Sequence, residues 1–182
     1  MNGIFKIFII ALLSMLVTGC ADNVRRFRID PSLKHQLRAS NFKAVELQSV
    51  SMPKGDDNSV VCRLNSMITL PDKMKYSQYI RDAVQKSLVF INDQKDNSTS
   101  YAHKLNILLT KVEVNTLKAR WYIEADVRVD NNKAIPLKTA MDHNFAYMAL
   151  TACSNAASAF DEAVDNFIKQ LFIHPEIAKQ LK

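Results

Sequence analysis

The sequence has few of the residues and motifs by which enzymes and metal proteins are usually recognised. Only 3 of its 182 residues are Gly and only 4 are His. It contains no glycine-rich phosphate loop, no G-x-S-x-G motif and no H-E-x-x-H motif. The histidines have no second histidine at helical spacing and are His35, His103, His143 and His174. We therefore expect a protein without enzyme activity, cofactor or metal.

Paired acid–base groups are equally scarce. Asp142 and His143 are the best candidates because they are adjacent in the sequence. Neighbouring residues on a strand point to opposite faces of a sheet, so these two side chains are not preoriented toward each other. An ordinary surface strand explains the pair better than a catalytic one.

Charge is almost missing from the N-terminus, where Lys6 is the only charged side chain among the first 21 residues. The segment from Ile7 to Val17 that follows it is apolar apart from one serine. About eleven apolar residues after a basic start are typical of a signal-peptide core. A membrane-spanning helix needs roughly 20 apolar residues, so this segment is too short to cross a bilayer comfortably. A buried helix of a cytosolic protein would explain the apolar segment but not the Gly19–Cys20 pair at its end.

The segment Leu16-Val17-Thr18-Gly19-Cys20 resembles the lipobox of bacterial lipoprotein precursors. This resemblance implies that residues 1–19 are a lipoprotein signal peptide and that lipid is attached to the thiol of Cys20. In such lipoproteins a residue other than Asp after the cysteine permits transfer to the outer membrane, and here that residue is Ala21. We therefore predict a lipid anchor in the periplasmic face of the outer membrane, with the inner membrane as the alternative. Several acyl chains together give stable anchoring.

Basic residues are concentrated just after the predicted cleavage site. They precede the first predicted strand and are Arg25, Arg26, Arg28, Lys34, Arg38 and Lys43. Residues 20–40 are therefore predicted to form a lipidated basic tether, either flexible and solvated or attracted to anionic headgroups. Nucleic acid is not an expected partner, because the chain is exported and shows no nucleic-acid-binding motif.

Two cysteines remain once Cys20 is assigned to lipid. Cys62 and Cys153 are an even pair in an oxidising compartment, which predicts a disulfide between them. Two buried free thiols are the alternative. A zinc site is not expected, because two distant cysteines do not have the paired spacing of zinc ligands.

Hydrophobic patterns predict one periplasmic domain over residues 41–182. The predicted strands are Phe42–Met52, Val60–Leu70, His103–Val114, Arg120–Asp130 and Ile135–Tyr147, and the predicted helices run from Tyr76 to Ile91 and from Thr151 to Leu171. The fold class is therefore α+β. We expect a single antiparallel sheet of four to five strands in the order ββαβββα, with two helices packed on one face.

The strand Arg120–Asp130 has the clearest alternation in the chain and indicates one buried and one wet face. Trp121 lies on the apolar face and is expected in the core. Arg120, Tyr122 and Arg128 share the polar face, where an aromatic ring among charges is a candidate site for an envelope protein partner. Singly exposed aromatics are also common, so an ordinary wet face is the alternative.

The order of elements resembles the small α+β domains of envelope lipoproteins, namely the LPS-assembly lipoprotein LptE, the YajG-like lipoproteins and the penicillin-binding-protein activator LpoB. Short strings similar to those of proteobacterial lipoproteins are Ile68-Thr69-Leu70-Pro71, Tyr79-Ile80-Arg81-Asp82-Ala83 and Thr151-Ala152-Cys153. The resemblance implies a non-enzymatic accessory or binding subunit of an envelope assembly or transport system. A peptidoglycan-associated or synthase-regulating lipoprotein, and an enzyme acting on envelope material, are the alternatives. No functional residue is transferred from these families.

Overall fold

A computed structural model describes residues 22–63, 66–93 and 101–182. The predicted signal peptide, residues 1–19, and the predicted lipidation site, Cys20, lie outside the described residues. Among the described residues, no helix is long and apolar enough to cross a membrane.

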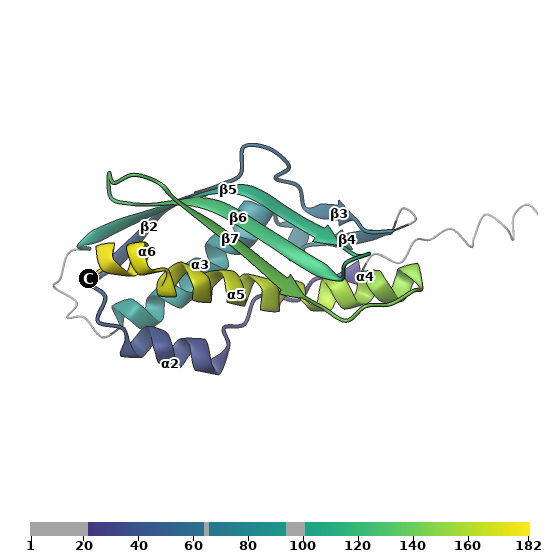
Figure 1. Cartoon of the computed structure of the whole chain (residues 1–182), viewed down its shortest axis with the longest axis horizontal. Coiled ribbons are helices and arrows are strands. Elements are labelled where there is room, and N and C mark those ends of the chain that lie inside the picture. The colour runs from purple at the N-terminus through teal and green to yellow at the C-terminus, as the bar shows by residue number, and fades with distance from the viewer. Residues whose placement is uncertain (1–21, 64–65, 94–100) are drawn as a thin grey trace, which may run out of the picture.

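The main sheet has four strands in the order β2-β5-β6-β7 (Figure 1). These strands are β2 (Val45–Ser51), β5 (His103–Asn115), β6 (Arg120–Val129) and β7 (Ile135–Asp142). Strands β5, β6 and β7 form an antiparallel meander. Together with the helices they confirm the α+β class.

Strand β2 differs from the predicted antiparallel arrangement, because it pairs with β5 in parallel. The connection between these two strands contains β3, β4 and helix α3 (Tyr76–Asn92). A connection of this length can carry the chain back to the starting edge of the sheet, which a parallel pair requires and a tight hairpin cannot provide. The main sheet is therefore mixed.

A second, small sheet has the order β1-β4-β3 and contains β1 (Asp22–Asn23), β4 (Met67–Thr69) and β3 (Ser59–Val61). The single strand predicted over Val60–Leu70 is thus two strands. They are separated by a turn in which Ser66 N–H donates to the Arg63 carbonyl at 2.9 Å. Cys62 N–H donates to the Ser66 carbonyl at 2.8 Å and closes the hairpin.

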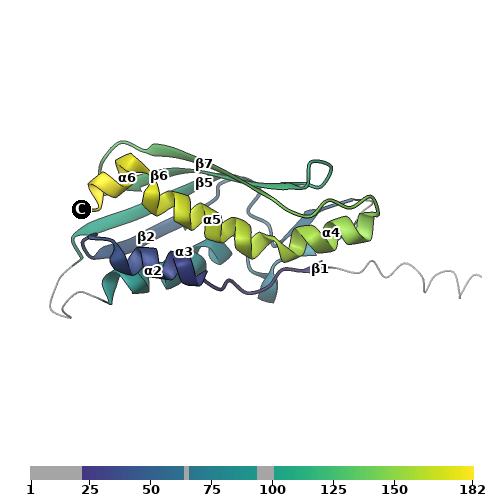
Figure 2. The ribbon, with the colours of Figure 1, turned by 60° about the horizontal axis from the view of Figure 1, so that its bottom comes forward.

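The helices lie on one side of the main sheet, and α2 forms an outer layer against α3 and α5 (Figure 2). They are α2 (Pro31–Ala39), α3, α4 (Ala149–Ser158), α5 (Phe160–Ile173) and α6 (Pro175–Gln180), with a short 3-10 turn at Pro71–Lys73. The final helix predicted from Thr151 to Leu171 is divided at Ala159 into α4 and α5. Pro175 follows the end of α5 and opens α6, where its missing N–H costs no hydrogen bond.

Most of the predicted tether belongs to the folded domain. Val24, Phe27, Leu33 and Leu37 are buried, and the basic residues Arg25, Arg26 and Arg28 between them are exposed. Asp30 starts α2 by accepting the Ser32 N–H at 2.8 Å. The prediction of a tether up to residue 40 is therefore corrected. The few apolar residues of this segment pack against α3 and α5, so the segment is part of the domain.

The core confirms the alternation of β6. Trp121 is 1% exposed and donates its Nε1–H to the Ala156 carbonyl at 2.8 Å. Its ring lies 4.7 Å from that of Phe160, which also contacts Tyr79 at 5.1 Å between centroids. Trp121 therefore joins the sheet to the α4–α5 junction and to α3.

Candidate functional site

The predicted partner-binding residues lie on the outer face of the main sheet, but two of them are engaged by neighbouring side chains. Arg120 donates from Nη2 to Asp142 Oδ2 at 2.9 Å and from Nε to Oδ1. This pairing lowers the pKa of the Asp142 carboxyl. The ammonium of Lys111 lies 5.0 Å from the centre of the Tyr122 ring. Of the three residues only Arg128 is exposed, whereas Arg120 and Tyr122 are half-buried, and partner binding at this face stays a prediction.

The adjacent acid–base candidates do not contact each other through their functional atoms. The Asp142 carboxylate is bound by Arg120, and His143 Nδ1 lies 3.1 Å from the Asn144 carbonyl oxygen. A different His–Asp pair forms across the main sheet, where His103 Nδ1 lies 2.9 Å from Asp130 Oδ2. This hydrogen bond lowers the pKa of Asp130.

The Asp130 pair has a structural role. Asp130 also accepts the Lys104 N–H at 2.8 Å and has a positive φ of 54°. These bonds hold Asp130, which follows β6 where the chain turns toward β7, against the start of β5.

A cleft of about 690 Å³ lies between residues 28–33 and α5. Its lining mixes both signs of charge and includes Arg28, Asp30, Asp161, Glu162, Asp165 and Lys169. Asp165 accepts the Asp30 N–H at 3.0 Å, and burial raises the pKa of its carboxyl. Within the part of the chain that the structure describes, no three His, Cys, Asp or Glu side chains are grouped to hold a metal ion.

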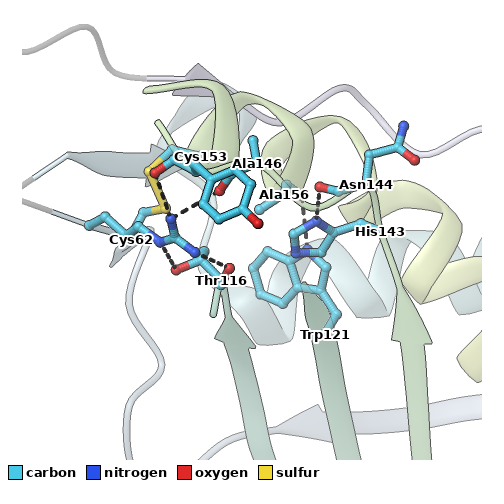
Figure 3. Close-up of a disulfide and its surroundings, with 10 residues drawn as sticks. Cys62, Thr116, Trp121, His143, Asn144, Ala146, Cys153 and Ala156 are labelled. Carbon is cyan, nitrogen blue, oxygen red and sulfur yellow. Dashed lines mark hydrogen bonds between the residues drawn. A yellow bond between two sulfur atoms is a disulfide. The ribbon is translucent and has the colours of Figure 1, made fainter. Parts of the chain in front are cut away.

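At another part of the molecule, a disulfide and several side-chain hydrogen bonds hold separate segments together (Figure 3). Cys62 and Cys153 are bonded as predicted, with a Cα–Cα distance of 5.8 Å. Cys62 follows β3 and Cys153 lies within α4, where it is fully buried. The disulfide therefore fixes α4 to the small sheet.

Arg63, which the sequence analysis did not single out, fastens two further segments to the same place. Its Nε donates to Thr116 Oγ1 at 3.0 Å, and its Nη2 donates to the Thr116 carbonyl. Its Nη1 donates to the carbonyls of Ala146 and Tyr147 at 3.0 and 3.2 Å. One guanidinium thus joins the β3–β4 hairpin, the β5–β6 turn and the connection from β7 to α4.

Six large hydrophobic side chains are exposed on these fastened segments. We refer to them together as the apolar patch, and they are Tyr147 (92% exposed), Leu117 (77%), Met148 (71%), Val61 (60%), Leu150 (55%) and Phe145 (50%). The ring of Phe145 lies edge-on to that of Tyr147 at 5.0 Å, and the Arg63 guanidinium lies 5.8 Å from the Phe145 ring. The exposed aromatics are therefore held in place by specific contacts.

The strand predicted over Ile135–Tyr147 ends early, which explains why two of these aromatics leave the sheet. Strand β6 begins at Arg120, and Arg120 is the partner of Asp142. Beyond Asp142 the chain has no β6 residue left to pair with, so β7 ends there. From residue 143 to residue 160 the sequence contains no Asp, Glu, Lys or Arg. That uncharged stretch was the signal in the sequence for this surface.

No protein-family model and no curated protein matches the sequence significantly. Among solved structures, the chain is similar to a candidate lipoprotein from Caulobacter crescentus CB15, known from its crystal structure. The two share 13% identity with a TM-score of 0.35, and the match covers 82% of this chain and 95% of the other.

Proposed function

We propose that the protein is a lipid-anchored accessory protein of the Gram-negative cell envelope that acts by binding and not by catalysis. Its anchor is lipid on Cys20, and its place is the periplasmic face of the outer membrane. It serves an envelope assembly or transport system by contacting a protein or a lipid-containing component of that system.

The apolar patch is the observation that supports a binding role. Monomeric soluble proteins rarely expose large contiguous apolar areas, and such areas mark interaction surfaces. Here three separate segments present apolar side chains, and both the Cys62–Cys153 disulfide and the Arg63 bonds hold those segments together. A surface that is exposed and yet rigid loses little conformational entropy when it is covered.

Two further features support the envelope as the location. The apolar segment that ends at Cys20 has the length of a signal-peptide core and resembles a lipobox at its end. The disulfide is of the kind that persists in the oxidising periplasm and is rare in the cytosol.

The anchor is tested by expressing the wild type, Cys20→Ala and the matched control Ala21→Ser in a Gram-negative host. We expect wild type and Ala21→Ser to be membrane-bound, with intact masses above that of residues 20–182 by the acyl groups. Cys20→Ala is expected to be unacylated. An unacylated, full-length wild-type protein in the cytosol would refute the proposal.

The binding role is tested in the same cells with a photo-crosslinking amino acid at position 147, in the apolar patch. The control places it at Ile173, which is 50% exposed at the end of α5 far from α4 (Figure 1). An adduct at 147 and none at 173 is expected, and the mass of the adduct distinguishes a protein partner from a phospholipid. If neither position yields an adduct, the patch is not a binding surface and the accessory role fails.

A further inference from the structure

The apolar patch and the start of the folded chain lie at the same end of the molecule. Strand β1 begins the described chain in the small sheet, next to β4, β3 and α4, while the C-terminus and α6 lie at the other end (Figures 1 and 2). The register places Asp22 beside Ile68, which in turn pairs with Val60. Adjacent strands are about 4.8 Å apart, so Asp22 and Val60 are separated by roughly 10 Å.

The direction of β1 brings the chain start still nearer to the patch. Because β1 is parallel to β4, the step from Asn23 to Asp22 runs alongside the step from Thr69 to Ile68, in the direction of Met67. Met67 pairs with Val61, a member of the apolar patch. The N-terminal end of β1 is therefore directed toward the disulfide and the patch.

Covalent geometry limits the distance from this point to the proposed anchor. Cys20 is two residues before Asp22, and two extended residues span at most about 7 Å. Lipid on Cys20 therefore holds this end of the domain against the headgroups, because there is no long tether to carry the domain away. The basic segment that had been predicted as a tether is folded from Val24 onward.

The chemistry of the patch matches the boundary between headgroups and acyl chains. Tyrosine is enriched at this boundary because its ring is apolar and its hydroxyl is polar. Tyr147 is 92% exposed, and its neighbours Met148 and Leu150 are apolar and exposed at the start of α4. No Asp, Glu, Lys or Arg lies between residues 143 and 160, so insertion of this segment buries no charge.

We propose that the apolar patch inserts into the surface of the membrane that holds the Cys20 lipid. The inference depends on the proposed anchor. The patch acts as a second, non-covalent contact that fixes the orientation of the domain: the disulfide end faces the bilayer, and the C-terminal end points into the periplasm. The outer face of the main sheet and the cleft beside α5 then remain open to other components.

The test measures the membrane depth of one added tryptophan at a time in the lipidated protein, expressed from the full-length sequence. Tyr147→Trp and Leu117→Trp place an indole in the patch, and Ile173→Trp is the matched control at the far end. Native Trp121 is 1% exposed and supplies the baseline. Each protein is reconstituted in vesicles of phosphatidylethanolamine and phosphatidylglycerol whose acyl chains carry bromine, which quenches nearby indoles, and in unbrominated vesicles of the same composition.

We expect brominated lipid to quench Tyr147→Trp and Leu117→Trp well beyond the wild-type baseline and to leave Ile173→Trp at that baseline. Lipidated protein in which the patch tryptophans are quenched no more than Ile173→Trp would overturn the inference and leave the anchor intact. Unquenched but blue-shifted patch emission would also overturn it, because a second copy or another protein would then cover the patch. Intact mass measured on the same samples separates these results from a failure of the anchor itself.

Discussion

Replacement of Arg63 by methionine removes the guanidinium that joins three segments at the disulfide end and keeps much of the apolar stem. The bonds to the Ala146 and Tyr147 carbonyls are near the surface, where water can replace them. Thr116 is only 7% exposed, so the carbonyl and hydroxyl that Arg63 satisfies there are left without an equivalent donor. Each stranded buried acceptor costs about 1–3 kcal/mol. Both bonds to Thr116 are only partly buried, so the lower end of this range applies to each acceptor, and we expect Arg63→Met to lower the free energy of unfolding by about 2–3 kcal/mol.

The assay is urea unfolding at equilibrium, followed by the fluorescence of Trp121. The slope of the unfolding free energy against urea concentration is expected to be unchanged in the variant. Arg120→Met is the matched control, because Arg120 donates two hydrogen bonds to the exposed Asp142, the same number that Arg63 donates to the buried Thr116. Exposed ion pairs contribute little to stability, so its effect is expected to be much smaller. Equal losses in the two variants would refute the argument that the buried acceptors of Thr116, and not the number of bonds, determine the cost.

Two further predictions concern the disulfide and the cleft. The double variant Cys62→Ala/Cys153→Ala opens a loop with a sequence separation of 91. In urea unfolding under oxidising conditions it is expected to lower the unfolding free energy by about 4 kcal/mol. A loss no greater than that of Arg63→Met would contradict this. Burial raises the pKa of the Asp165 carboxyl above its ordinary 3.8. Between 3.8 and the raised pKa the folded protein therefore binds more protons than the unfolded chain, so stability falls as the pH rises through that window. Asp165→Asn is therefore expected to remove this fall and to gain stability relative to wild type at neutral pH but not at pH 3; a thermal unfolding series across pH that leaves the two proteins parallel would contradict it.

The parts of the fold that the sequence predicted well are those set by local alternation. Strand β6 buries Trp121, Ile123 and Ala125 because alternate residues on a strand share a face, and this pattern is complete within one strand. Helix α3 was predicted from Tyr76 to Ile91 and extends to Asn92, since its apolar residues recur at the helical period over several turns. Neither prediction needs knowledge of the partner element.

The parts that were mispredicted depend on which segments meet in space. The parallel pairing of β2 with β5 is set by the path of the chain through β3, β4 and α3. The residues of β2 themselves carry no pattern that indicates the direction of its neighbour. Helix α2 buries only Leu33 and Leu37, too few apolar residues to distinguish a packed helix from a basic tether. In both cases tertiary contacts with other elements decided the structure.

The apolar patch was missed for a related reason. Valine in a strand, leucine in a turn and aromatics near a helix start each suggest buried residues when they are considered one at a time, and exposure is a property of the assembled fold. Arg63 has no recognisable motif, yet its four hydrogen bonds reach acceptors from two distant segments and so keep Phe145 and Tyr147 at the surface. Burying these rings in the core would have been the simpler use of apolar side chains. A disulfide and a guanidinium beside the start of the folded chain instead hold the rings at the surface, which forgoes the free energy that their burial in the core would provide. A membrane that removes the rings from water restores this free energy.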